Sequence, residues 1–343
     1  MGVEIPLEAL TPIFAGGAEP RGSAELRAAP FRGLLRFWWR ALVAGVTGDQ
    51  NLEAVRQAES TVFGSTELAS PVVIRVKGSP DSQKFPSPGP GVSYLLWSVV
   101  RTNRQCLPAG TRFSLTVDLR AGVRNSDPIN RTLLSLWLLV HLGGVGARSR
   151  RGGGSVQALP GTGPLHDVPK LDVSGRSPEE LQAHLAAGLT QCREAVRAVA
   201  SEGSVSATPS FDVVHPSCCR VAVVDRAWPT SDQALDAIGQ SLMHFRDHRQ
   251  PDYSKVKAVV AGATRTLTTV ERAAFGLPIV FYYRSLRGQK DILEGRDNDR
   301  RASPLLIRVT RLANSQFTVV LTVFKASLLD ASRSVESRCD AVV

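Results

Sequence analysis

Runs of apolar residues divide the 343-residue chain into two stretches of mixed helix and strand. Alternation of apolar and polar positions predicts strands, whereas apolar positions that repeat every three or four residues predict helices. The first stretch is predicted to contain strands over residues 3–14, 71–76, 93–100, 112–119 and 156–159 and helices over 30–44, 51–62 and 128–142. The second stretch is predicted to contain strands over residues 219–224, 277–283, 304–309 and 317–324, helices over 178–200 and 232–245, and a helical turn over 269–275.

This order of elements predicts an α+β fold made of two tandem ferredoxin-like (βαββαβ) domains with antiparallel sheets. Segments rich in proline, glycine and serine mark the boundaries between them. We expect an N-terminal domain over residues 1–160, a linker with one helix over 161–210, and a C-terminal domain over 211–343. The two halves are not obvious sequence repeats, so the duplication is inferred from element order alone.

The first predicted helix, with the sequence PFRGLLRFWWRAL, places Arg32, Arg36 and Arg40 one turn apart on one face. Aromatic and leucine side chains between them are apolar enough to bury the other faces. A fixed row of guanidinium groups is suited to binding phosphates. Alternatively, the arginines pair with Glu53 or Glu59 of the next helix, or extend to solvent from a buried helix.

A second basic stretch, residues 143–154, has six glycines and carries Arg148, Arg150 and Arg151. Glycine lets backbone N–H groups approach a phosphate closely, so we expect this run to contact a nucleic-acid backbone beside the arginine helix. A flexible surface loop without a ligand is the alternative. The complete set of residues predicted to bind RNA is Gly16, Gly17, Arg27, Arg32, Arg36, Arg40, Arg148, Arg150, Arg151, Gly152, Arg246, Arg300 and Arg301.

The net charge of +10 favours a polyanionic partner. Residues 1–160 carry 18 Lys and Arg against 11 Asp and Glu, whereas the other residues carry 23 against 20, so the basic excess lies mainly in the first half. Aromatic residues make up only 6% of the chain, and no aromatic RNA-binding strand pattern is present. Binding through charge and backbone shape therefore fits better than recognition of base sequence.

Candidate catalytic groups are few. His141 lies at the end of a buried helix beside the glycine run, where a histidine could act as general acid or base. His244 and His248 are one turn apart but lack a third ligand at a recognisable spacing, and Asp297 and Asp299 could hold magnesium but lie among arginines. We therefore expect no metal, no cofactor and no catalytic residues.

Cysteine usage and hydropathy indicate a reduced, cytosolic protein. The five cysteines form no CxxC pair, and no signal peptide is expected at the N-terminus. The most apolar window, residues 133–142, is too short to cross a bilayer.

Several motifs in chain order resemble a known family. They are LTPIFAGGA at 10–18, PFRGLLRFWWRAL at 30–42, AESTVFGST at 58–66, the glycine run GGVGARSRRGGGS, RAAFGLPIVF at 272–281 and RRASPLLIRV at 300–309. Together they resemble the RAMP superfamily of CRISPR proteins, and within it the family of first subunits of the Cmr, or type III-B, effector complex.

The resemblance implies two ferredoxin-like domains and a place at the end of the effector that holds the 3′ part of the CRISPR RNA. It implies CRISPR RNA, target RNA and adjacent RAMP subunits of the Cmr type as partners, and a non-catalytic part in capturing target RNA. The alternatives are a metal-independent RAMP endoribonuclease that processes CRISPR RNA, for which His141 is the candidate, and an unrelated two-domain protein with basic surfaces.

Overall fold

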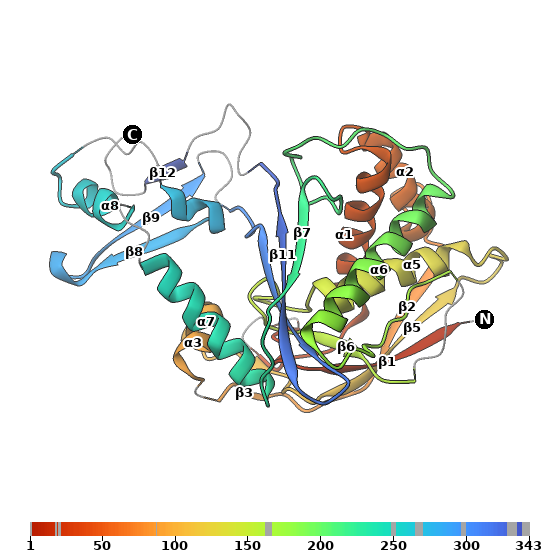
Figure 1. Cartoon of the computed structure of the whole chain (residues 1–343), viewed down its shortest axis with the longest axis horizontal. Coiled ribbons are helices and arrows are strands. Elements are labelled where there is room, and N and C mark those ends of the chain that lie inside the picture. Colours follow the sequence, from red (N-terminus) through yellow and green to blue (C-terminus); the bar gives the residue numbers. More distant parts are fainter. Residues whose placement is uncertain are drawn as a thin grey trace.

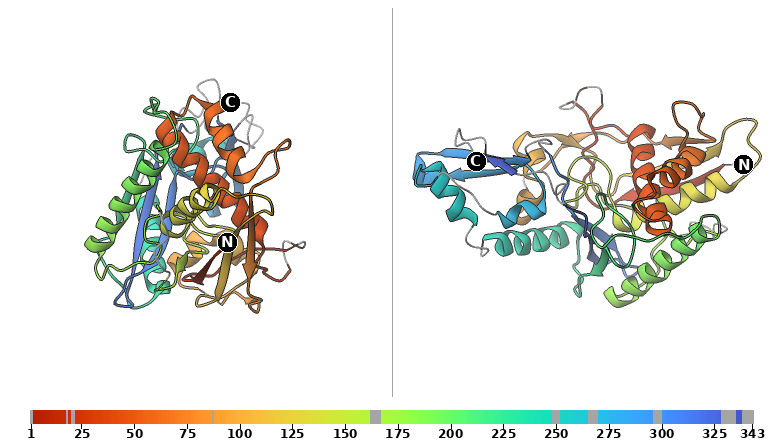
Figure 2. Two further views of the ribbon diagram at one scale, coloured as in Figure 1. Left: turned by 90° about the vertical axis from the view of Figure 1, so that its right-hand side faces the viewer. Right: turned by 90° about the horizontal axis from the view of Figure 1, so that it is seen from above.

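The computed structural model describes residues 2–17, 19, 22–86, 88–161, 167–247, 252–264, 270–295, 300–327 and 335–337. The chain forms an elongated molecule in which helices and a four-stranded sheet make up one end, a second sheet lies at the centre and a small sheet forms the other end (Figure 1, Figure 2). The expected mixture of helices with antiparallel sheets is confirmed.

The first sheet has the strand order β2-β5-β1-β6, and its three strand pairs are antiparallel. Its register places Ile5 opposite Leu115 and Ile74 opposite Val117, and all four side chains are buried. Helices α1, α2 and α5 lie over this sheet in Figure 1. The bounds are β1 (Val3–Ala9), α1 (Ala28–Thr47), α2 (Leu52–Phe63), β2 (Val72–Lys77), β5 (Arg112–Leu119), α5 (Asp127–Leu142) and β6 (Val156–Ala158).

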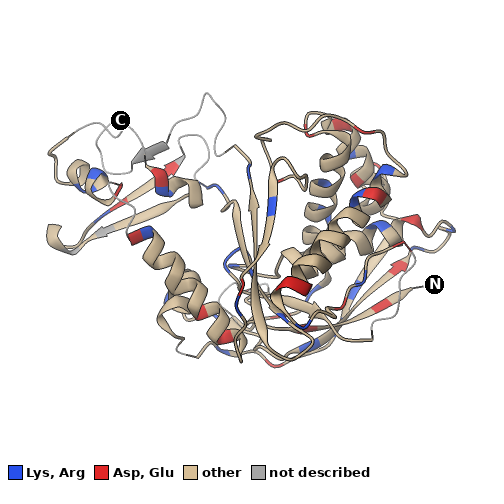
Figure 3. Cartoon of the chain, viewed as in Figure 1, with Lys and Arg blue, Asp and Glu red and all other residues tan. Residues whose placement is uncertain are grey.

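Polar side chains on strands of this sheet pair with each other across the strands. Lys77 pairs with Glu4 at 2.5 Å, and Arg112 pairs with Glu8 at 3.1 Å. Arg311, from the second sheet, also pairs with Glu8 at 2.5 Å. Arg112 and Arg311 share one carboxylate, so these three basic residues retain a net charge of about +1. Acidic residues are interspersed with basic ones over the molecule (Figure 3).

The second sheet has the order β10-β11-β7, and β10 and β11 form the predicted hairpin. Helix α7 packs on both hairpin strands, and α6 packs against α1 and β7. The bounds are α6 (Pro178–Arg197), β7 (Cys219–Val223), α7 (Ser231–Asp247), β10 (Leu305–Arg311) and β11 (Phe317–Phe324).

A third, small sheet of order β12-β9-β8 is inserted in the chain between α7 and β10, with β12 added from near the C-terminus. It has its own apolar cluster, which includes Val256, Phe281 and Tyr283. The bounds are α8 (Asp252–Val260), η1 (Glu271–Phe275), β8 (Ile279–Tyr283), η2 (Arg284–Leu286), β9 (Gln289–Gly295) and β12 (Val335–Ser337). The predicted strand at 277–283 is thus confirmed. The helical turn predicted at 269–275 is present over Glu271–Phe275, and Thr269 lies outside the described residues.

The predicted strand over residues 93–100 is wrong, because this segment forms two short helices, α3 (Pro90–Leu95) and α4 (Trp97–Arg101). Val92, Leu95 and Val99 are buried at helical spacing, and Pro90 suits a first helical turn. A short apolar run fits either element, so its period alone does not decide between them. Two short strands, β3 (Gln83–Lys84) and β4 (Gln105–Cys106), flank these helices.

Helices α3 and α7 cross at very close range. A Cβ atom on Gly91 would lie 2.0 Å from the carbonyl oxygen of Asp236, and one on Gly239 would lie 2.2 Å from that of Gly91. The Asp236 carboxylate accepts hydrogen bonds from the backbone N–H groups of Gly91 at 2.8 Å and Val92 at 3.1 Å. Both glycines are therefore needed for the crossing, and Asp236 caps the N-terminus of α3.

The largest apolar core contains side chains from both halves of the chain. It contains Trp38, Trp39 and Trp137 together with Phe324 of β11, and the rings of Trp38 and Phe324 lie 6.2 Å apart. Cys106, Cys192, Cys218 and Cys219 are buried and free. Among the residues that the structure describes, no helix is long and apolar enough to span a membrane.

Candidate nucleic-acid interface

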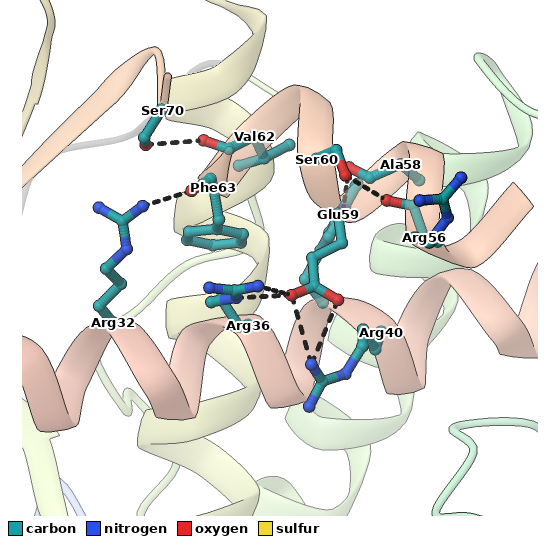
Figure 4. Close-up of polar contacts among 11 residues, drawn as sticks. Arg32, Arg36, Arg40, Arg56, Ala58, Glu59, Ser60, Val62, Phe63 and Ser70 are labelled. Atoms are coloured by element: carbon teal, nitrogen blue, oxygen red, sulfur yellow. Dashed lines mark hydrogen bonds and ion pairs between the residues drawn. The ribbon is translucent and has the colours of Figure 1, made fainter. Parts of the chain in front are cut away.

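Helix α1 is anchored by the aromatic residues between its arginines. Phe31, Leu35, Trp38 and Trp39 are at most 2% exposed, and the Trp39 indole donates a 2.9 Å hydrogen bond to the Ala58 carbonyl of α2. The arginines at every fourth position lie on the face that meets α2 and the segment after it (Figure 4). The predicted helix and its arginine face are therefore present.

Two arginines of this row form ion pairs within the protein. Arg36 donates to the Glu59 carboxylate at 2.5 Å, and Arg40 approaches the same carboxylate at 3.2 Å (Figure 4). Glu59 is 7% exposed, whereas the arginine side chains are 38% and 44% exposed. The alternative in which these arginines pair with Glu59 is thus realised, and one carboxylate offsets only one of the two positive charges.

Arg32 lies beside a cavity of about 360 Å³ at the C-terminal end of α2. Its guanidinium donates to the Phe63 carbonyl (Figure 4), and Arg120, which follows β5, donates at 2.8 Å to the Ser70 carbonyl. The cavity is lined by Arg32, Arg36, Arg120 and seven residues of the segment 63–70, none of them acidic. Burial, with further contributions from Arg36 and Arg120, lowers the pKa of Arg32. Three guanidinium groups thus converge on a cavity whose lining contains no carboxylate, and we call these ten residues the arginine cavity.

The FGS sequence at 63–65 builds one wall of the arginine cavity. Gly64 has φ +75°, and a Cβ there would lie 2.5 Å from the Leu68 carbonyl oxygen, so only glycine fits. The Ser65 hydroxyl accepts hydrogen bonds from the backbone N–H groups of Glu67 at 3.2 Å and Leu68 at 3.1 Å. This turn fixes the wall opposite Arg32, which gives the motif a physical role.

The glycine run is a packed connector rather than a mobile surface loop. Arg148 donates to the Leu95 carbonyl at 2.9 Å, and Arg151 donates to the Phe275 carbonyl at 2.9 Å. Arg150 donates to the Asp212 carboxylate at 2.5 Å. The three side chains thus tie the run to separate segments, and the single cradle expected from this run together with the arginine helix is not formed.

The glycines of the run serve close chain packing. A Cβ on Gly154 would lie 1.8 Å from the Val145 carbonyl oxygen, and one on Gly152 would lie 2.3 Å from the Leu235 side chain. Both have positive φ. Glycine is required here because two segments approach each other, not because backbone approaches an open ligand site.

The other residues predicted to bind RNA lie apart from the arginine cavity. Arg27 is exposed and donates to the Gly16 carbonyl at 2.9 Å, while a Cβ on Gly17 would meet the Glu25 carboxylate. Arg301 donates to the Ser327 carbonyl at 3.1 Å, Arg300 is exposed beside it, and Arg246 lies at the end of α7. Of the predicted set, only Arg32 and Arg36 line the arginine cavity.

His141, the candidate for catalysis, is 1% exposed. Its ring lies 4.5 Å from that of Trp137 and 5.0 Å from that of His184. Burial, with the neighbouring His184 and Arg308, lowers the pKa of His141 well below its ordinary value, so the ring is neutral. Because it is enclosed in the core, His141 is not placed to reach an RNA strand. His248, Asp297 and Asp299 lie outside the described residues. The residues that the structure does describe contain no cluster suited to a metal ion.

Two arginines were missed by sequence reasoning. Arg120 follows a predicted strand and has no distinctive motif around it. Arg308 of β10 is 1% exposed and donates to the carbonyls of Gly143 at 3.0 Å and Val156 at 2.6 Å. Burial lowers the pKa of Arg308 to about 9. The alternation of residues along β10 places Arg308 on one face of the second sheet. The sequence does not indicate that the first half of the chain covers that face.

Comparison with known proteins places this architecture in a family. The RAMP superfamily profile matches residues 6–157. Cmr subunit Cmr1-2 of Pyrococcus furiosus is 35% identical over 173 residues, which cover 44% of this chain and 91% of that protein. Cmr subunit Cmr1-1 of the same organism is 25% identical over 339 residues, covering 96% of this chain and 90% of that protein.

Solved structures share the fold. The apo form of Cmr1 from Pyrococcus furiosus superposes with a TM-score of 0.66 at 22% identity, covering 97% of this chain and 91% of that chain. A chain of the type III-B Cmr-beta complex bound to cognate target RNA superposes with a TM-score of 0.54 at 11% identity, covering 97% and 94%. The chain belongs to the RAMP superfamily of CRISPR proteins, in the family of the first Cmr subunit.

Proposed function

We propose that the chain is a non-catalytic, RNA-binding subunit of a type III-B Cmr effector, and that the arginine cavity binds phosphates of an RNA strand. In this proposal it lies at the end that holds the 3′ part of the CRISPR RNA, beside other RAMP subunits, and helps to capture target RNA in antiviral defence. Relatives named as Cmr subunits support the assembly, and a chain of similar fold in a complex bound to target RNA supports the ligand.

The proposal includes two tandem ferredoxin-like domains, residues 1–160 and 211–343, joined by a linker and α6. Strand order β2-β5-β1-β6, with α1 and α2 before β2 and α5 before β6, supports a complete βαββαβ unit. The order β10-β11-β7, with α7 following β7, supports a second unit that retains βαββ and carries the small sheet as an insertion.

The main support for RNA binding is that three guanidinium groups converge on a cavity whose lining contains no carboxylate. Arg120 is exposed, and Arg32 and Arg36 are partly exposed, so a phosphate can reach all three from solvent. Arginine presents a planar fork of donors that matches phosphate oxygens. A phosphate here would replace the mutual repulsion that Arg32 experiences from Arg36 and Arg120 with attraction.

The test is binding of a fluorescein-labelled single-stranded RNA across a salt series. Each phosphate neutralised on a single strand contributes about 0.7 to the slope of log affinity against log salt. The variant Arg32→Gln/Arg120→Gln should lower this slope by up to roughly 1.4 and weaken binding similarly for all sequences.

Arg56→Gln is the matched control, because Arg56 lies on the same helix pair but is 74% exposed and already paired with Glu53 at 2.9 Å. Its loss should leave both affinity and slope nearly unchanged. Equal slopes for the native protein and the double variant would remove the arginine cavity from the proposal.

The burial of His141 supports the non-catalytic part of the proposal. Incubation of the purified protein with CRISPR repeat RNA in EDTA should leave the RNA intact. Specific cleavage that His141→Ala abolishes would instead support the metal-independent endoribonuclease.

A further inference from the structure

A second cavity, of about 250 Å³, lies at the C-terminal end of α7, away from the arginine cavity. It is lined by Phe245, Arg246, Glu271, Arg272, Ala274 and Phe275, and we call these six residues the aromatic pocket. Its walls come from α7 and from η1, the turn that leads into the small sheet. The pocket therefore lies where the inserted small sheet joins the second sheet.

The aromatic pocket combines ring faces with guanidinium groups. The rings of Phe245 and Phe275 meet edge to face at 6.0 Å, and Phe245 is 43% exposed. The Arg246 guanidinium lies 5.7 Å from the centre of the Phe275 ring and 6.0 Å from that of Tyr94. An exposed ring beside a guanidinium that is itself held by aromatic neighbours can receive another flat ring.

The guanidinium groups around this pocket retain unused donors. Arg272 donates through Nη2 to the Arg246 carbonyl at 2.7 Å, and Arg151 donates to the Phe275 carbonyl at 2.9 Å. Arg151 Nη1, Arg246 Nε and Arg272 Nε are buried and have no hydrogen-bond partner among the described residues. Buried donors without partners are uncommon in folded proteins, so these three guanidinium groups are not fully satisfied by the described residues.

The local charge is also positive. The pocket lining has two arginines, Arg246 and Arg272, and one carboxylate, that of Glu271. A second carboxylate, that of Asp252, accepts the backbone N–H of Arg272 at 2.6 Å. Burial and the nearby Arg148 and Arg246 lower the pKa of Arg151 to about 10. The described carboxylates thus do not fully compensate these arginines, and an anion would relieve their repulsion.

We propose that the aromatic pocket binds one unpaired nucleotide of an RNA strand, with the base stacked on Phe245 and its phosphate bound by Arg246 and Arg272. This rests on the proposed RNA-binding function and adds a second contact point on the strand. A carboxylate of a partner protein would satisfy the arginines but would not use the exposed ring, so a nucleotide accounts for more of the site.

Phe245→Leu is the main test, since it keeps apolar volume and removes the ring. Stacking on an aromatic side chain contributes enough per base that affinity for single-stranded RNA should fall roughly 5- to 150-fold, with the salt slope unchanged. Phe245→Tyr keeps the ring and should bind like the native chain. Arg246→Gln should instead lower the salt slope by about 0.7.

A scan with abasic RNA identifies the stacked base. In the native protein one abasic position should reproduce the loss caused by Phe245→Leu, and in the Phe245→Leu variant that position should cause no further loss. Melting temperatures of all variants establish that each remains folded. If every abasic position has the same effect in both proteins, the stacking assignment is overturned.

The outcomes separate this inference from the proposed function. Salt-dependent RNA binding that Arg32→Gln/Arg120→Gln weakens, but Phe245→Leu and Arg246→Gln leave unchanged, overturns the aromatic pocket alone. Absence of salt-dependent RNA binding by the native chain overturns both. If the pocket variants bind RNA normally but no longer co-purify with other effector subunits, the occupant is a protein segment and the nucleotide assignment is wrong.

Discussion

The most direct prediction concerns Arg150, which we expect to stabilise the fold rather than to bind RNA. Its guanidinium donates to the Asp212 carboxylate at 2.5 Å and to the Ser303 carbonyl at 2.6 Å, and it lies over the Phe37 ring at 5.5 Å. The side chains of Arg150 and Asp212 are 23% and 4% exposed. One residue of the glycine run thus joins three distant segments of the chain.

The variant Arg150→Met keeps the aliphatic stem and removes the charge. It leaves the Asp212 carboxylate buried without its ion-pair partner, and Asp212 Oδ1 already has no partner among the described residues. Breaking a buried ion pair in this way costs about 3–5 kcal/mol. Because Arg150 is about a quarter exposed, we expect a loss near the lower end, about 3 kcal/mol in the free energy of unfolding.

Urea unfolding followed by tryptophan fluorescence measures this loss. Adding Asp212→Asn to Arg150→Met removes the uncompensated charge and should restore about 2 kcal/mol, which a double-mutant cycle reports as coupling. Arg27→Met is the matched control, because Arg27 is 48% exposed and lies 3.9 Å from Glu25. Its loss should cost less than about 1 kcal/mol.

One result would refute this reasoning. If Arg150→Met unfolds within about 0.5 kcal/mol of the native protein while the salt slope of RNA binding falls by about 0.7, the arginine contacts phosphate instead. Replacing all three arginines of the glycine run together would be a poor test of RNA binding, because the loss of their contacts within the chain would first disturb the fold.

Three further predictions follow from buried groups. Gly188→Ala should lower stability by about 1–3 kcal/mol in urea unfolding, because a Cβ there would lie 2.0 Å from the Trp137 ring. Burial lowers the pKa of His141 and His184 in the folded chain, so below the ordinary histidine pKa of about 6.5 the unfolded chain binds more protons than the folded chain. This contribution to stability is fully present above about pH 6.5 and falls by up to about 1.4 kcal/mol per histidine per pH unit below it. His141→Leu should therefore flatten the profile of urea midpoint against pH between about pH 7.5 and 5. Glu59→Gln should destabilise the chain by only about 1 kcal/mol, because the two arginines that lose their shared carboxylate are 38% and 44% exposed. It should raise RNA affinity and its salt slope, and lower RNA affinity in the folded variant would contradict this.

Local sequence patterns were sufficient for most elements but not for their contacts. The spacing of arginines and aromatic residues predicted α1, because the helical period places the arginines on one face and the apolar side chains on the others. Whether Arg36 meets Glu59 or a phosphate depends on how α1 packs against α2, so both alternatives had to stay open. The segment 93–100 was misassigned because a short apolar run fits a strand or a helix equally well.

The candidate site was harder to predict because the same residue types serve different purposes. Glycines permit both phosphate approach and close chain packing, and the run around Gly154 uses them for packing. Arg120 comes to the arginine cavity only through the pairing of β5 with β2, which the sequence does not specify. Arg308 is buried because segments from the first half of the chain cover the face of β10 on which it lies, and the sequence of β10 alone does not show this.

The crossing of α3 and α7 at Gly91 and Gly239 has a mechanical consequence. Arg246 lies seven residues beyond Gly239 on α7, about 10 Å along the helix axis at 1.5 Å per residue. Because Gly239 lies at the middle of α7, a tilt of roughly 10° at the crossing would displace Arg246 by about 2 Å and the N-terminal end of the helix by a similar distance in the opposite direction. Two glycines that line neither cavity therefore set the position of the C-terminal end of this helix.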